Sequence, residues 1–122
     1  MKTNAFLSIA REAYGIADSK KAVSPLLLNV RKLTTLADYF LIVTGESIPQ
    51  INAITEAIYK GLRDSRGIMP AHRDGRDSAN WSVIDYGGLV VHVMHPAARK
   101  IYALEKIWDG ALKVKPLKKK RR

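Results

Sequence analysis

Cysteine is absent from the 122-residue sequence, and long apolar runs are absent too. Without cysteine the chain can form neither a disulfide framework nor a thiolate metal site, which suits a reducing compartment. The longest apolar stretches, such as PLLLNV and YFLIVTG, fall well short of the roughly 20 residues that span a bilayer. The N-terminus also lacks the continuous apolar core of a signal peptide. We therefore expect a cytoplasmic protein that has no membrane partner.

Acidic residues are few beside the basic ones, at 11 against 21, and the net charge is +10. Seven of the 21 basic residues lie in the last ten positions, so the remainder carries 14 basic and 11 acidic residues. We expect one folded domain at 1–112 and a basic, disordered tail at 113–122. Such a tail is either a solubilising end or a phosphate-contacting segment that releases counterions. The expected phosphate contacts are Lys118, Lys119, Lys120, Arg121 and Arg122.

Hydrophobic periodicity predicts helices and strands in the order α-β-β-α-β-β-β-α. The predicted elements cover residues 4–17, 25–30, 38–45, 47–67, 68–74, 81–86, 89–95 and 96–110. We expect a single α/β domain in which helices flank one mixed sheet of about five strands. The short strand at 68–74 should lie at an edge, because Pro70 cannot donate to a ladder.

Local signals mark the ends of two predicted helices. Ser47 can cap the second helix with Gln50 as its capping-box partner, and Gly67 can end it in the left-handed conformation. Pro96 begins the last helix. The residues expected to point inward from that helix are Ile101, Leu104, Ile107 and Trp108.

The stretch WSVIDYGGLVVHVMH reads as a hairpin turned by Gly87 and Gly88 in a primed two-residue turn. That turn pairs Asp85 with Val90, and it places alternate side chains on opposite faces. One face is mostly apolar and is expected against helices: Ser82, Ile84, Tyr86, Leu89, Val91 and Val93. The other, called the mixed face, carries Trp81, Val83, Asp85, Val90, His92 and Met94. A three-residue loop would instead swap the faces of the two strands relative to each other.

The mixed face lacks what a catalytic or metal site needs. Asp85 could orient His92, but no nucleophile stands nearby, because Ser82 points to the other face. His92 and His95 are three residues apart, which puts them on opposite faces of a strand. The remaining ligand set of His92, Asp85 and His72 is weak, because it has no local ligand spacing. Two interpretations stay open. The face is a partner-binding patch with buried anchors and an orienting charge, or Trp81 and Met94 are core residues beneath another helix.

The segment TGES, between a strand and a helix, is similar to the start of a nucleotidyltransferase site. Such enzymes need paired carboxylates to hold two metal ions. Here the following strand offers only Asp74, with Asp77 in a turn, and no phosphate-binding glycine loop exists. We therefore expect neither an enzyme nor a cofactor. A nucleotide-binding or transferase enzyme stays open as a second class of function.

Several separated motifs resemble the ribosomal silencing factor (Iojap, RsfS) family. They are KKA, ADYFLIVTG, WSVIDYG, VVHV and the spaced set Arg99, Tyr102, Leu104, Glu105 and Trp108. The resemblance implies a nucleotidyltransferase-like fold without the catalytic carboxylates. It also implies binding to the fourteenth protein of the large ribosomal subunit, which blocks joining of the small subunit and lowers translation.

The resemblance extends to single positions. The matching ones are Asp38, Tyr39, Trp81, Asp85, Tyr86, His92, Arg99, Tyr102, Glu105 and Trp108. Tyr39, Tyr86 and Trp108 are alternatively core residues. The expected partner contacts are Trp81, Val83, Asp85, His92, Met94, Arg99, Tyr102 and Asp38. An assembly factor that binds ribosomal RNA stays open as an alternative function. Weak contact of the tail with ribosomal RNA and a homodimer through the mixed face are further expectations.

Three departures from the family pattern remove negative charge. Gly88 stands where the family usually has an acid, and Pro96-Ala97 replaces an acidic helix start. Arg73-Asp74-Gly75 departs from the common Glu-Gly pattern, with an arginine before the aspartate. Either the affinity for a basic partner is lower in this chain, or the partner surface has changed with it.

Overall fold

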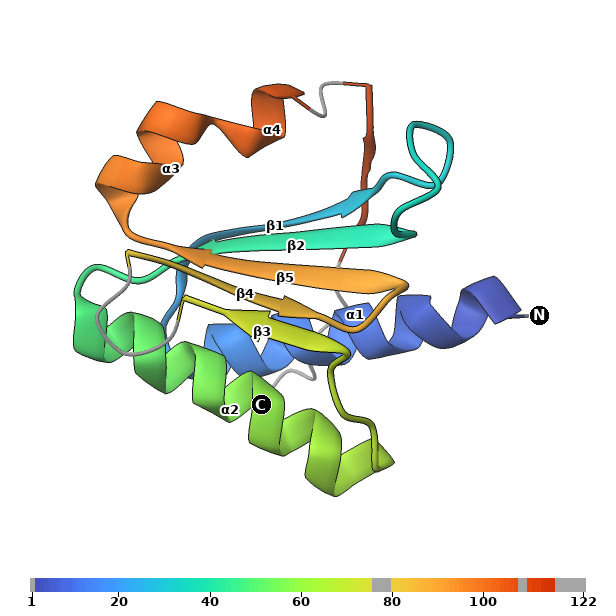
Figure 1. The fold of residues 1–122 in the computed structure, drawn as a ribbon, viewed down its shortest axis with the longest axis horizontal. Coiled ribbons are helices and arrows are strands. Elements are labelled where there is room, and N and C mark those ends of the chain that lie inside the picture. Colours follow the sequence, from blue (N-terminus) through green and yellow to red (C-terminus); the bar gives the residue numbers. More distant parts are fainter. Residues whose placement is uncertain (1, 76–79, 108–109, 116–122) are drawn as a thin grey trace, which may run out of the picture.

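The computed structural model describes residues 2–75, 80–107 and 110–115 (Figure 1). Its elements, in chain order, are α1 (Lys2–Ser19), β1 (Val23–Asn29), β2 (Tyr39–Thr44), α2 (Ile48–Arg66), β3 (His72–Asp74), β4 (Trp81–Asp85), β5 (Leu89–Met94), α3 (Pro96–Tyr102), α4 (Leu104–Ile107) and β6 (Leu112–Lys113). No helix among these residues is long and apolar enough to cross a bilayer.

The strands form one mixed sheet in the order β3-β4-β5-β2-β1-β6. Only β2 and β5 run parallel, and the other described pairs are antiparallel. Figure 1 shows α1 and α2 on one side of the sheet and α3 and α4 on the other. The predicted single α/β domain is confirmed, with six strands instead of about five. As expected, β3 lies at an edge.

The sixth strand corrects the predicted boundary between the domain and the tail. Lys113, expected in the tail, lies in β6 opposite Leu28 of β1. The amide of Val114 donates to the Leu27 carbonyl at 2.8 Å. Arg11 of α1 donates to the carbonyl of Lys115 at 3.1 Å. The folded part therefore continues to Lys115, and the expected phosphate contacts of the tail lie outside the described residues.

Two apolar layers hold the sheet between its helices. The larger lies against α1 and α2, where Ala10, Ala13 and Ala17 are fully buried and their small side chains let α1 approach the sheet closely. The smaller lies beneath α3 and α4. Its buried members are Leu28, Val30, Ala37, Phe40, Ile42, Met94, Ala98 and Leu104.

The predicted ends of α2 are confirmed. The Ser47 side chain accepts a hydrogen bond from the Gln50 amide at 3.1 Å, and the side-chain oxygen of Gln50 accepts from the Glu46 amide at 2.7 Å. Gly67 ends the helix with a φ of 69°, in the left-handed region.

The last helix differs from its prediction. It breaks at Ala103, whose φ is 45°, so α3 and α4 replace one continuous helix. Leu104 is buried as expected, but Ile101 is 75% exposed, and its predicted inward direction is wrong. The break interrupts the stripe that a continuous helix would turn toward the sheet. The Ile107 side chain and Trp108 lie outside the part of the chain that is described.

Candidate functional site

The hairpin of β4 and β5 has the predicted two-residue turn. Asp85 lies opposite Val90, and Trp81 lies opposite Met94. Gly87 takes a φ of 89°, which glycine adopts without steric cost. The Asp85 carboxylate accepts a hydrogen bond from the Gly87 amide at 2.7 Å and so stabilises the turn.

The register places each side chain on the face predicted for it. The apolar face packs against α1 and α2, where Ile84, Leu89, Val91 and Val93 are fully buried. Ser82, on the same face, is 1% exposed, so its hydroxyl cannot serve the opposite side of the sheet.

The mixed face is only partly covered, because α3 and α4 pack over its Met94 end. Met94 is fully buried in the smaller core. Its prediction as a partner contact is therefore wrong, since Ala98 and Leu104 take up the space above that end of the sheet. The rest of the mixed face is half-buried, and we call it the open face: Trp81, Val83, Asp85, Val90 and His92. The core interpretation is thus confirmed for Met94, whereas partner binding stays a prediction for the open face.

An aromatic cluster borders the open face. The ring centroids of Trp81 and Tyr102 are 4.7 Å apart, and Tyr102 is 52% exposed. The Trp81 indole nitrogen donates to Nδ1 of His92 at 3.1 Å. Phe40 meets the His92 ring edge-on, with centroids 5.4 Å apart. Tyr102 of α3 is thereby held beside Trp81 of β4, as a rigid apolar surface with a polar rim.

His92 is neutral at physiological pH. Burial lowers the pKa of its imidazole from the ordinary 6.5 to about 4, and the nearby Asp85 carboxylate only partly offsets this. Because Nδ1 accepts the indole hydrogen bond, the proton of the neutral ring lies on Nε2. His92 therefore positions the Trp81 ring through this hydrogen bond and adds no charge to the open face. The negative charge of the face comes from Asp85.

Arg99 and Asp38 lie apart from this cluster. Arg99 of α3 donates to the Ser24 carbonyl of β1 at 2.7 Å and to the Thr44 hydroxyl of β2 at 3.0 Å. Asp38 lies at the turn end of the hairpin, where its amide donates to the Gly88 carbonyl at 2.9 Å. The length of β5 separates that end from Trp81, roughly 17 Å at the usual rise per residue.

Two residues of β3 lie on the open face, and neither was predicted as a partner contact. His72 lies opposite Asp85, and Asp74 lies opposite Val83, so both share that face of the sheet and both are exposed. Arg73 points to the other side, where it pairs with Glu56 and covers the Tyr59 ring at 4.3 Å. A strand of three residues is too short for a pattern of alternating polar and apolar side chains to predict its register.

The described side chains around the open face do not form an arrangement typical of a catalytic or metal site. Within the described residues, no three histidine or acidic side chains come together as metal ligands. His95 lies off the open face, where its ring caps α3 by accepting from the Ala97 amide at 3.2 Å. The open face is suited to non-covalent contact through aromatic rings and carboxylates.

Comparison with known proteins gives consistent matches. A family model described as "Ribosomal silencing factor during starvation" matches residues 3–122. The ribosomal silencing factor RsfS of Bacillus subtilis is 40% identical over 104 residues, which are 85% of this chain and 87% of that protein. A crystal structure of a protein from Chromobacterium violaceum has a TM-score of 0.78 at 29% identity, covering 98% of this chain and 95% of the other. Mitochondrial assembly of ribosomal large subunit protein 1 of Mus musculus is 35% identical over 74 residues, 58% of this chain and 32% of that protein.

Proposed function

This chain belongs to the ribosomal silencing factor (RsfS) family, and on that premise we propose that it binds the large ribosomal subunit through the subunit's fourteenth protein. Occupation of that protein would block joining of the small subunit and repress translation. The mechanism is steric and needs no bond to be made or broken. The name of the mouse relative, which refers to the large ribosomal subunit, supports this choice of partner.

The observation that carries the proposal is the open face with its aromatic border. Trp81 and Tyr102 come from different elements and are held together by the cluster around His92. Aromatic anchors that are already ordered lose little entropy on binding, so they supply affinity efficiently. A half-covered sheet face of this kind is typical of a surface that a partner completes.

The charge of the open face indicates which charge the partner surface should carry. Asp85 and the exposed Asp74 carry negative charge there, whereas the half-buried His92 is neutral. A basic surface on the ribosomal protein would meet these carboxylates, and the pairing would favour one orientation of docking. Arg99 and Met94 are left out of the proposed contact, because one ties α3 to the strands and the other is buried.

Co-sedimentation with purified large subunits tests the assignment. We expect Asp85→Lys and Tyr102→Ala each to weaken binding about tenfold or more, by charge reversal and by loss of an aromatic anchor. Asp85→Asn should give an intermediate loss, since the amide oxygen can still accept from Gly87 while the charge is gone.

Matched controls come from the opposite side of the molecule and from another surface loop. Asp64 on α2 has a 70% exposed side chain, and Leu36 is 80% exposed. Asp64→Lys repeats the charge reversal and Leu36→Ala repeats the apolar truncation, and both should bind normally. Unchanged binding of Asp85→Lys and Tyr102→Ala, with the fold verified by circular dichroism, would remove the open face from the interface.

A homodimer through the same face would compete with ribosome binding. Ile101 and Tyr102 are both more than half exposed beside the open face, and such apolar surface favours self-association. Sedimentation equilibrium of the wild type and of Tyr102→Ala measures whether the chain forms a dimer and whether Tyr102 is needed for it. A dimer that Tyr102→Ala dissociates, and that large subunits also dissociate, places both contacts on one surface.

A further inference from the structure

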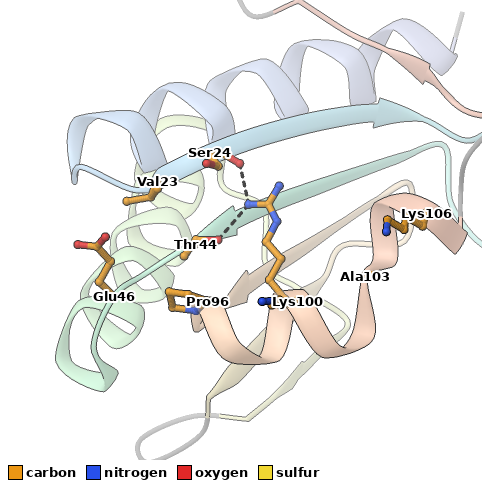
Figure 2. Close-up of a pocket in the computed structure, with 9 residues that line it drawn as sticks. Val23, Ser24, Thr44, Glu46, Pro96, Lys100, Ala103 and Lys106 are labelled. Atoms are coloured by element: carbon orange, nitrogen blue, oxygen red, sulfur yellow. Dashed lines mark hydrogen bonds between the residues drawn. The ribbon is translucent and has the colours of Figure 1, made fainter.

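A pocket of about 610 Å³ lies at the carboxyl ends of the two parallel strands, and Tyr102 is not among its lining residues. Figure 2 shows its labelled side chains arriving from β1 and β2 on one side and from α3 and α4 on the other. The lining residues are Val23, Ser24, Thr44, Glu46, Pro96, Arg99, Lys100, Ala103 and Lys106. Its volume falls in the range of small-molecule sites, and open α/β sheets bind ligands at this end of their strands.

Unusual backbone conformations build two walls of the pocket. Ser24 has a φ of 49°, and the pairing of β1 with β2 shifts register between Val23 and Leu26. Ala103 has a φ of 45°. Two of the three non-glycine residues described with positive φ therefore line this one pocket. Such conformations and bulges gather at binding sites because the surrounding structure must hold them in place.

Positive charge prevails around the pocket. Arg99 is one of the lining residues, and its guanidinium donates to the Ser24 carbonyl and to the Thr44 hydroxyl, as the dashed lines in Figure 2 mark. Lys100 and Lys106 are exposed, and no hydrogen bond or ion pair to another described residue occupies either ammonium group. Glu46 is the one acidic residue among the lining side chains.

We propose that this pocket binds a small phosphorylated metabolite of about nucleotide size. Lys100 and Lys106 contact the phosphate oxygens as mobile point charges, and Arg99 adds a fixed positive charge beneath them. Glu46 accepts hydrogen bonds from hydroxyl groups at the other end of the ligand. Val23, Pro96 and Ala103 supply the apolar wall. The pocket is separate from the open face. The proposal concerns ligand binding alone and involves no chemical reaction.

Titration of the ¹⁵N-labelled full-length chain, followed by nuclear magnetic resonance, tests this proposal. The probes are ADP, glucose 6-phosphate and inorganic pyrophosphate, with adenosine as the uncharged comparison. We expect at least one phosphorylated probe to shift the amides of the pocket lining saturably, with a Kd below about 1 mM. Adenosine at the same concentrations should leave these amides unshifted.

Charge variants separate the pocket from other basic surfaces. The double variant Lys100→Glu with Lys106→Glu should weaken binding about tenfold or more, whereas Lys60→Glu, an exposed lysine on α2, should bind like the wild type. Absence of saturable shifts for all three phosphorylated probes would overturn the proposal. Shifts that persist unchanged in the double variant would also overturn it, because they would assign the phosphate contact to the basic tail.

Discussion

Among the described residues, His92 has an imidazole whose pKa is lowered from 6.5 to about 4 by burial. Its ring lies between Phe40 and Trp81, where burial disfavours the charged form more strongly than Asp85 favours it. The unfolded chain therefore takes up a proton near pH 6.5, and the folded chain does so only near pH 4. Between these values the unfolded state binds more protons, so stability rises with pH.

We predict that the free energy of unfolding falls as the pH drops from about 6.5 to about 4, and that His92 contributes about 3 kcal/mol to this fall. Below pH 4 the contribution of His92 should be constant. Urea denaturation of the wild type and of His92→Asn at several pH values measures it, because the other titrating groups are common to both. A difference between the two proteins that does not vary with pH would contradict a neutral, buried His92.

Gly88 explains at the residue scale why an acid is missing where the family resemblance predicts one. A Cβ atom at this position would lie less than 3.0 Å from three ring carbons of Phe6 on α1. The turn of the hairpin and the first helix are therefore packed directly on each other, and a side chain at residue 88 would have to displace the ring.

We predict that Gly88→Ala lowers the free energy of unfolding by about 1–3 kcal/mol through this overlap. In a Phe6→Ala background the same substitution should cost much less, as a double-mutant cycle in urea would show. Gly87→Ala is the matched control, since no atom lies within 4 Å of its Cβ but its φ is 89°. Its cost is backbone strain, which Phe6→Ala should not relieve. Equal costs of Gly88→Ala in both backgrounds would contradict the contact.

At the scale of elements, local chemistry made α2 and the β4–β5 hairpin predictable. Ser47, Gln50 and Gly67 satisfy backbone groups within a few residues of themselves, and Gly87 fixes the hairpin register through its own conformation. Such signals do not depend on the rest of the fold, so the sequence alone expresses them.

The features that were missed depend on distant partners. β6 has two residues, too few for any periodicity, and it forms because β1 offers it an unpaired edge. The burial of Met94 and the exposure of Ile101 follow from where α3 lies on the sheet, which no local pattern specifies. The face of each hairpin residue could therefore be predicted, but not which part of that face stays open.

The break between α3 and α4 gives a prediction at this scale. Ala103 is held at a φ of 45°, where an L-residue is strained and glycine is not. Ala103→Gly should therefore raise the free energy of unfolding by about 0.5–1 kcal/mol. Ala97→Gly, in the ordinary first turn of α3, should lower it by about 0.5 kcal/mol. Thermal melting distinguishes the two signs, and a loss of stability in both variants would argue against the break.

For the whole molecule, we predict that the basic residues after position 115 add a salt-dependent contribution to binding. Ending the chain after Lys115 removes five basic residues and reduces the net charge from +10 to +5. The truncated chain retains β6 and the contact of Arg11 with Lys115, so its melting temperature should stay the same. Its binding to large subunits should be weaker at low salt and equal to the full chain at high salt. Equal binding at all salt concentrations would make the tail irrelevant to the ribosome.

We propose that occupation of the large subunit by the open face excludes the small subunit. Sucrose-gradient sedimentation of separated subunits, mixed at a magnesium concentration that allows joining, tests it most directly. With the wild-type protein present, we predict that the peak of joined ribosomes falls and that the protein travels with the large subunit. Asp85→Lys should leave joining intact, and Asp64→Lys should block it like the wild type. Undiminished joining while the wild-type protein is bound to large subunits would contradict the claim.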